Sequence, residues 1–148
     1  MQRDKQAGFT LVEVLVALVV VSVGMLGIAG LYVHGLQAGR TAMFSHQAVT
    51  LAGDVADRIR ANPRAGEAYA GAGTDNNCVA GGVDCNEAEM AAHDIFAWTQ
   101  QAQNSLPNGT IQVQINNATV PPEYTITVGW TEPGENPQYV VTIPVLGR

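Results

Sequence analysis

The residue whose chemistry stands out is Glu13, the one charged residue between Phe9 and Val33 of a 148-residue chain. Almost all of its neighbours in that stretch are apolar, and the apolar run continues to about Leu36. A carboxylate near the centre of a hydrocarbon layer costs at least about 2.5–3.5 kcal/mol on insertion scales. We therefore expect Glu13 either to reach water at the membrane interface or to have a positively charged partner.

A partner for Glu13 would be created if the chain were cut between Gly8 and Phe9. Cleavage there would leave an α-ammonium on Phe9, one helical turn from the Glu13 carboxylate. The two groups could pair within one chain, or each Glu13 could neutralise the amine of a neighbouring chain stacked with a stagger. The alternatives are an uncleaved single-span anchor, or an ordinary secretory signal cut near Ala29 and Gly30.

The apolar run itself is long enough to cross a membrane, because about 20 mostly apolar residues span a bilayer. It is also longer than the apolar part of an ordinary secretory signal, which has about 7–15 residues. The leader before it carries Arg3 and Lys5, and basic residues tend to stay on the cytoplasmic side. We therefore expect the N-terminus in the cytoplasm and the rest of the chain on the outer side.

Composition and cysteine content limit what else the chain could do. Removing residues 1–8 takes away two of the 7 basic and one of the 13 acidic residues, which leaves a net charge of −7. Such an acidic chain is a poor candidate for nucleic-acid binding, which needs a basic surface. Cys78 and Cys85 both lie in the exported part, and they indicate a disulfide in an oxidising compartment.

No arrangement of residues in the sequence supports catalysis, a metal site or a cofactor. The cysteine spacing is not C-x-x-C and the three histidines are scattered, so a metal site is a poor alternative to the disulfide. His93 and Asp94 are adjacent, and adjacent residues on a helix point apart, so they cannot form a dyad. We therefore expect neither an enzyme nor a catalytic residue.

Two helices are predicted to position these groups. The first runs from Phe9 to Ala61, because an apolar stripe continues past the membrane run until Asn62 and Pro63 end it. This stripe consists of Phe44, Ala48, Leu51, Val55 and Ile59. Asp54 and Arg58 are expected to pair on its surface. The glycines of the first half fit close helix packing, local loss of helix, or the ordinary tolerance of membrane helices for glycine.

The second helix is predicted over residues 86–105, with Asn86 and Glu89 as a capping box and Trp98 in its buried stripe. The residues before it, 64–84, are rich in glycine, alanine and asparagine, have few large side chains, and predict a loop of about 20 residues. A bridge between Cys78 and Cys85 would attach this loop to the second helix.

A small sheet is predicted after the turn at residues 106–109. Apolar residues alternate with polar ones in three segments, at 111–115, 124–130 and 141–145. This period of two, with proline-rich connections, predicts a three-stranded antiparallel meander. One face of such a sheet needs an apolar cover, which the stripe of the first helix would supply.

Residues 8–13 (GFTLVE), followed by the apolar run, resemble the class III leader and N-terminal helix of type IV prepilins. The resemblance implies that a prepilin peptidase cleaves after Gly8 and that the nitrogen of Phe9 is methylated. It also implies that Glu13 guides the docking of subunits into a filament.

The same resemblance implies an α+β fold of the type IV pilin kind. A long N-terminal helix, the membrane or filament anchor, would pack on a small three- to four-stranded antiparallel sheet, with a second helix before the sheet. The implied regions are a leader at 1–8, a membrane or filament-core half of the helix at 9–36, an amphipathic half at 37–62, and a periplasmic globular domain at 63–148.

Within the type IV pilins, the chain looks like the PilV family of minor pilins. The similar features are the cysteine pair, residues 87–94 (EAEMAAHD), Trp98, and residues 106–109 (LPNG) and 124–130 (YTITVGW). This implies a subunit that joins other minor pilins and the major pilin in a complex that primes assembly, sits at the tip, presents an adhesin and supports motility. Before assembly it would lie in the bacterial inner membrane with its C-terminus in the periplasm. The alternative is a minor pseudopilin of a type II secretion system.

Overall fold

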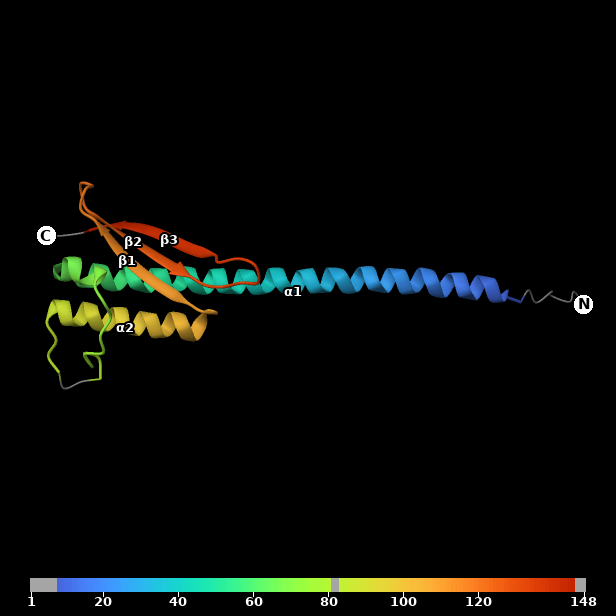
Figure 1. Cartoon of the computed structure of the whole chain (residues 1–148), viewed down its shortest axis with the longest axis horizontal. Coiled ribbons are helices and arrows are strands. Elements are labelled where there is room, and N and C mark those ends of the chain that lie inside the picture. The colour runs from blue at the N-terminus through green and yellow to red at the C-terminus, as the bar shows by residue number, and fades with distance from the viewer. Residues whose placement is uncertain (1–7, 81–82, 146–148) are drawn as a thin grey trace, which may run out of the picture. The chain divides into compact units, whose positions relative to one another are not determined.

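A computed structural model describes residues 8–80 and 83–145 of the chain (Figure 1). The leader predicted at 1–8 therefore lies outside the described residues, except for Gly8. The chain forms two compact units, which divide between Arg40 and Thr41. Its elements are α1 (Leu11–Ala61), the 3-10 helix η1 (Pro63–Ala70), α2 (Glu87–Ser105), β1 (Thr110–Asn116), β2 (Glu123–Gly129) and β3 (Gln138–Pro144).

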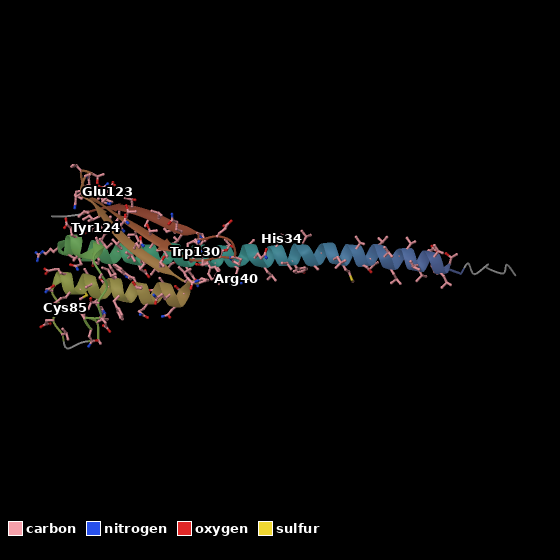
Figure 2. All side chains as sticks on the ribbon, in the orientation of Figure 1. His34, Arg40, Cys85, Glu123, Tyr124 and Trp130 are labelled. Carbon is pink, nitrogen blue, oxygen red and sulfur yellow. A yellow bond between two sulfur atoms is a disulfide. The ribbon has the colours of Figure 1, made fainter. Side chains whose placement is uncertain are left out.

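The first unit, in its described part, consists of the start of the chain and the first part of α1. Every residue from 8 to 40 is exposed, although most of the side chains are apolar. In Figure 2 these side chains project to both sides of the ribbon. The helix contains an 18-residue window of mean hydropathy 2.7 and is long and apolar enough to cross a membrane. A helix that is apolar on all sides needs an apolar environment from outside its own chain.

In the second unit, α1 changes to a helix with a single buried stripe. The five predicted stripe residues are each 8% exposed or less, and they share one core with side chains from η1, α2, β2 and β3. The green last part of α1 in Figure 1 belongs to this unit, together with α2 and the strands. The predicted stripe is therefore confirmed. The helix ends at Ala61, as predicted from Asn62 and Pro63.

The sheet is an antiparallel meander in the order β1-β2-β3. Its central strand supplies most of the buried side chains, since Tyr124, Ile126 and Val128 alternate with partly exposed residues. Ile126 lies opposite Val113 of β1 and Val141 of β3, so the three apolar segments share one face as predicted. Tyr124 also donates a hydrogen bond from its hydroxyl to the Gly66 carbonyl oxygen at 2.9 Å.

The start of α2 is capped as the sequence predicts, with Asn86 just before the helix. Its side-chain oxygen accepts hydrogen bonds from the N–H groups of Ala88 and Glu89, at 3.0 and 2.9 Å. In return the Glu89 carboxylate accepts from the Asn86 N–H at 2.9 Å. This reciprocal capping box satisfies amides that the helix itself leaves unpaired.

The turn after α2 requires a glycine. The Gly109 N–H donates to the Leu106 carbonyl oxygen at 3.0 Å, which brings the chain back over the end of the helix. A Cβ atom on Gly109 would lie 2.0 Å from the carbonyl oxygen of Ala102. Because no side chain fits there, the chain can enter β1 by this path only with glycine at this position.

The loop predicted for residues 64–84 is wrong in its first part, which forms η1. Pro63 begins this helix, a position where proline is favoured because the first N–H needs no partner within the helix. The segment is held by Tyr69, which is 1% exposed and stacks on Trp98 with ring centroids 5.7 Å apart. One buried aromatic residue therefore orders a segment that has no other large apolar side chain.

Candidate functional site

Glu13 lies in the first turn of α1, three residues after Thr10. The Thr10 hydroxyl accepts a hydrogen bond from the Glu13 N–H at 3.3 Å, and its carbonyl accepts from the Val14 N–H at 3.3 Å. Thr10 is therefore the cap of the helix. An acidic side chain in the first turn faces the positive end of the helix dipole, an interaction worth about 0.3–1 kcal/mol. Sequence reasoning missed this cap, although Thr-x-x-Glu is the capping-box pattern.

Gly8 and Phe9 lie before the helix. The helix was predicted to start at Phe9, but it starts at Leu11. The start is later because Thr10 takes the cap position. Phe9 is 84% exposed, and Glu13 is exposed as well. The peptide bond between Gly8 and Phe9 is therefore outside the helix. In the uncleaved chain the Phe9 nitrogen is an amide, so a positive charge on this nitrogen would exist only after cleavage.

The surface around Glu13 is a mostly apolar helix. Its large apolar side chains from Leu11 to Leu36 are between 49% and 90% exposed. Exposed apolar surface of this extent marks a site of contact with protein or membrane. The glycines of this stretch have open space where a Cβ would lie, which leaves room for another helix to approach; they are Gly24, Gly27, Gly30, Gly35 and Gly39.

The second predicted site, the cysteine pair, is a disulfide between Cys78 and Cys85 with Cα atoms 5.7 Å apart. The chain just before it is attached to α2, as predicted. The N–H of Thr74 and the side-chain amide of Asn76 both donate to carbonyl oxygens of α2, each at 2.9 Å. Hydrogen bonds to the helix backbone therefore attach this segment, in addition to the disulfide.

A buried carboxylate that sequence reasoning did not single out joins α1, η1 and α2. Asp94 is 3% exposed and accepts from the Arg58 guanidinium at 2.7 Å and from the Tyr69 hydroxyl at 3.1 Å. The predicted surface pair of Arg58 with Asp54 is therefore wrong. The buried carboxylate needs a charged partner more than an exposed one does. Burial, with the nearby Asp94 carboxylate, raises the pKa of Tyr69.

His93, the residue before Asp94, lies close to a different carboxylate. His93 and Asp94 have different neighbours, as predicted, since His93 Nδ1 lies 3.4 Å from an Asp75 carboxylate oxygen. Within residues 8–80 and 83–145, no group of three or more His, Cys, Asp or Glu side chains is placed to hold a metal ion. The feature with clear chemical meaning for function is therefore the start of α1.

Two family models match consecutive parts of the chain. Residues 3–29 match the model described as prokaryotic N-terminal methylation motif, and residues 30–96 match the model described as Type IV pilin Tt1218. No curated protein and no solved structure gave a significant match. The chain thus carries the class III leader motif and a type IV pilin segment, which supports a pilin subunit. Its long apolar helix, further helix and three-stranded antiparallel sheet are consistent with the type IV pilin fold, so the predicted fold class is confirmed.

Proposed function

We propose that this chain, with its leader motif and type IV pilin segment, is a minor pilin of the PilV family. It joins other minor pilins and the major pilin in a complex that primes assembly of a type IV pilus. The complex sits at the pilus tip, presents an adhesin and supports motility. The observation that carries the proposal is the motif at residues 8–13, which leads into the exposed, apolar first part of α1.

Processing comes before assembly in this proposal. The subunit is anchored in the bacterial inner membrane with its leader in the cytoplasm and its residues 63–148 in the periplasm. A prepilin peptidase cuts between Gly8 and Phe9 and methylates the new amine. Support comes from the exposed, non-helical position of this bond. Intact-mass measurement of the mature protein should give a chain that starts at Phe9 with one added methyl group, whereas a chain that retains residues 1–8 would contradict it.

Glu13 docks the subunit against its neighbours. In a filament the carboxylate would be surrounded by apolar helices, where it costs at least about 2.5–3.5 kcal/mol. The interaction of the carboxylate with the helix dipole offsets only about 0.3–1 kcal/mol of this cost, so most of the cost remains. The methylated amine of Phe9 on another subunit is a cation at the right depth to pair with it.

The test replaces Glu13 by valine in the full-length chain. Export, cleavage and the Cys78–Cys85 disulfide should be unchanged, since none of them uses the carboxylate. Recovery with other pilins and the number of pili should both fall. Val14→Ala is the matched control, because it alters the neighbouring exposed side chain without removing a charge, and it should behave like the wild type.

Two outcomes would count against the proposal. If the Glu13→Val protein is recovered with its partners at the wild-type level and supports normal piliation, Glu13 has no docking role. If deletion of the protein abolishes protein secretion and leaves pili intact, the subunit is a minor pseudopilin of a type II secretion system.

A further inference from the structure

The two edges of the sheet differ in what lies beside them. β1 contacts η1 and α2 as well as β2. β3 is the other edge, and β2 is its one strand partner in the described sheet. Figure 1 shows β3 on the side of the sheet that faces away from α2. Within the described residues, no strand pairs with its outer backbone groups.

The register identifies these outer groups. The hydrogen bonds that flank β3 run from the Val145 N–H to the Pro122 carbonyl, at 2.7 Å, and from the Trp130 N–H to the Pro137 carbonyl, at 3.1 Å. In an antiparallel pair the bonded positions alternate, so the β3 residues bonded to β2 are 139, 141 and 143. The residues between them direct their N–H and C=O groups away from the sheet; these are Gln138, Val140 and Thr142.

β3 has few of the features that normally protect an open edge. Proteins protect such edges with charged side chains, bulges, prolines or a covering element. β3 contains no charged residue, and Pro144, its single proline, is its last residue. Val140, at the centre of the strand, is 48% exposed. The strand is also rich in β-branched residues, which favour the extended conformation that pairing needs.

Acidic residues lie near both ends of β3, one of them on the neighbouring strand β2. Glu135 precedes β3 and is exposed, and Glu123 lies opposite Pro144 at the other end. A second copy of the chain would bring its own acidic residues to the same edge, and facing like charges are destabilising. The matching occupant is therefore an uncharged extended segment with basic residues at its ends.

We propose that the outer edge of β3 is where a different pilin subunit adds a strand to this sheet. Main-chain hydrogen bonds to residues 138–142 would supply affinity, and the acidic ends would select the partner. The inference rests on the proposed function, because it takes the partner from the same pilus complex. It places a second contact in the globular unit, separate from the one at Glu13.

Proline at position 140 tests the edge directly. The Val140 N–H makes no bond to β2, and proline is tolerated on edge strands where the N–H faces outward. Val140→Pro in the full-length chain, expressed with the other pilins, should lower their recovery about tenfold, as expected for loss of a buried hydrogen bond. Val140→Thr is the matched control, since it keeps the N–H and the branched side chain, and it should leave recovery unchanged.

Val140→Lys keeps the proposal falsifiable if the proline variant fails to fold. It retains the N–H but places a charge on the edge, and it should lower recovery as well. A photo-cross-linking amino acid at position 140 should capture a different pilin, whereas one at Gln112, on β1, should not.

Each other outcome overturns the inference. If the Val140→Lys and Val140→Pro proteins are recovered with other pilins as well as the wild type is, the β3 edge is not a contact. The proposed function still stands in that case. Capture of a second copy from position 140 overturns the choice of partner. If the wild type is recovered with no other pilin, the proposed function fails, and this inference fails with it.

Discussion

Two stretches of the same helix, residues 11–40 and 41–61, bury their side chains in opposite ways. The first has no buried residue, and the second buries a stripe of seven residues in the core. Both are fully helical, so the difference lies in what covers the helix rather than in the helix itself. The chain completes the packing of its second unit and leaves the described apolar side chains of its first unit exposed.

The largest effect is expected when the Trp98 side chain is removed from the core of the second unit. Trp98→Ala should lower the free energy of unfolding of that unit by about 3–5 kcal/mol, because Trp98 is 2% exposed in the core. Leu26→Ala, in the exposed stretch, should leave it unchanged. Urea unfolding of the full-length chain in detergent, followed by Trp130 fluorescence, measures both. An equal loss in the two variants would show that the two stretches are not independent.

A smaller effect is expected at Asp94. Asp94→Ala should cost about 2 kcal/mol, because it leaves the Tyr69 hydroxyl and the Arg58 guanidinium without their acceptor. The cost is limited because the Arg58 side chain is 52% exposed and keeps part of its hydration. Asp54→Ala, an exposed acid on the same helix, should change stability by less than about 0.5 kcal/mol. The same urea titration separates them, and equal costs would mean that the buried network adds nothing.

The smallest effect concerns pH, and it again separates the two units. Burial raises the pKa of Tyr69, so above about pH 10 its phenol is ionised in the unfolded chain but still protonated in the fold. The unfolded state then binds fewer protons, so stability falls with rising pH, by about 1.4 kcal/mol per pH unit for one such tyrosine. Below that pH the contribution does not vary.

Tyr69→Phe should remove this part of the slope when unfolding is measured between neutral and alkaline pH. Tyr32→Phe is the matched control in the first unit, where the side chain is exposed, and it should keep the wild-type slope. A slope that is the same in all three proteins would show that Tyr69 ionises as easily in the fold as outside it.

Most of the second unit could be predicted because its signals are local. The cap at Asn86, the stripe that contains Trp98 and the alternation around Ile126 each depend on residues a few positions apart. The pair of Arg58 with Asp94 could not be predicted, since the two residues are 36 positions apart and Asp54 offered a nearer partner. η1 was missed because Tyr69 is its one large apolar side chain, so the segment shows no apolar period.

The features of the candidate site also differ in whether their sequence signals are local. The motif at residues 8–13 could be recognised in the sequence because it consists of consecutive residues. The cap of Thr10 on Glu13 was equally local and was overlooked. The open edge of β3 needs the register of three strands, so no pattern within one segment could reveal which amides point outward.

The space around the glycines has a consequence for how this sequence can vary in evolution. At Gly109 and Gly73 a Cβ would lie 2.0 and 2.6 Å from backbone atoms of the same chain, so selection there acts through the subunit's own fold. The glycines of residues 24–39 have no such neighbour within 4 Å. Any of them that stays invariant among relatives, or changes only together with a residue of another pilin, would mark a point where the backbone of a neighbouring subunit passes.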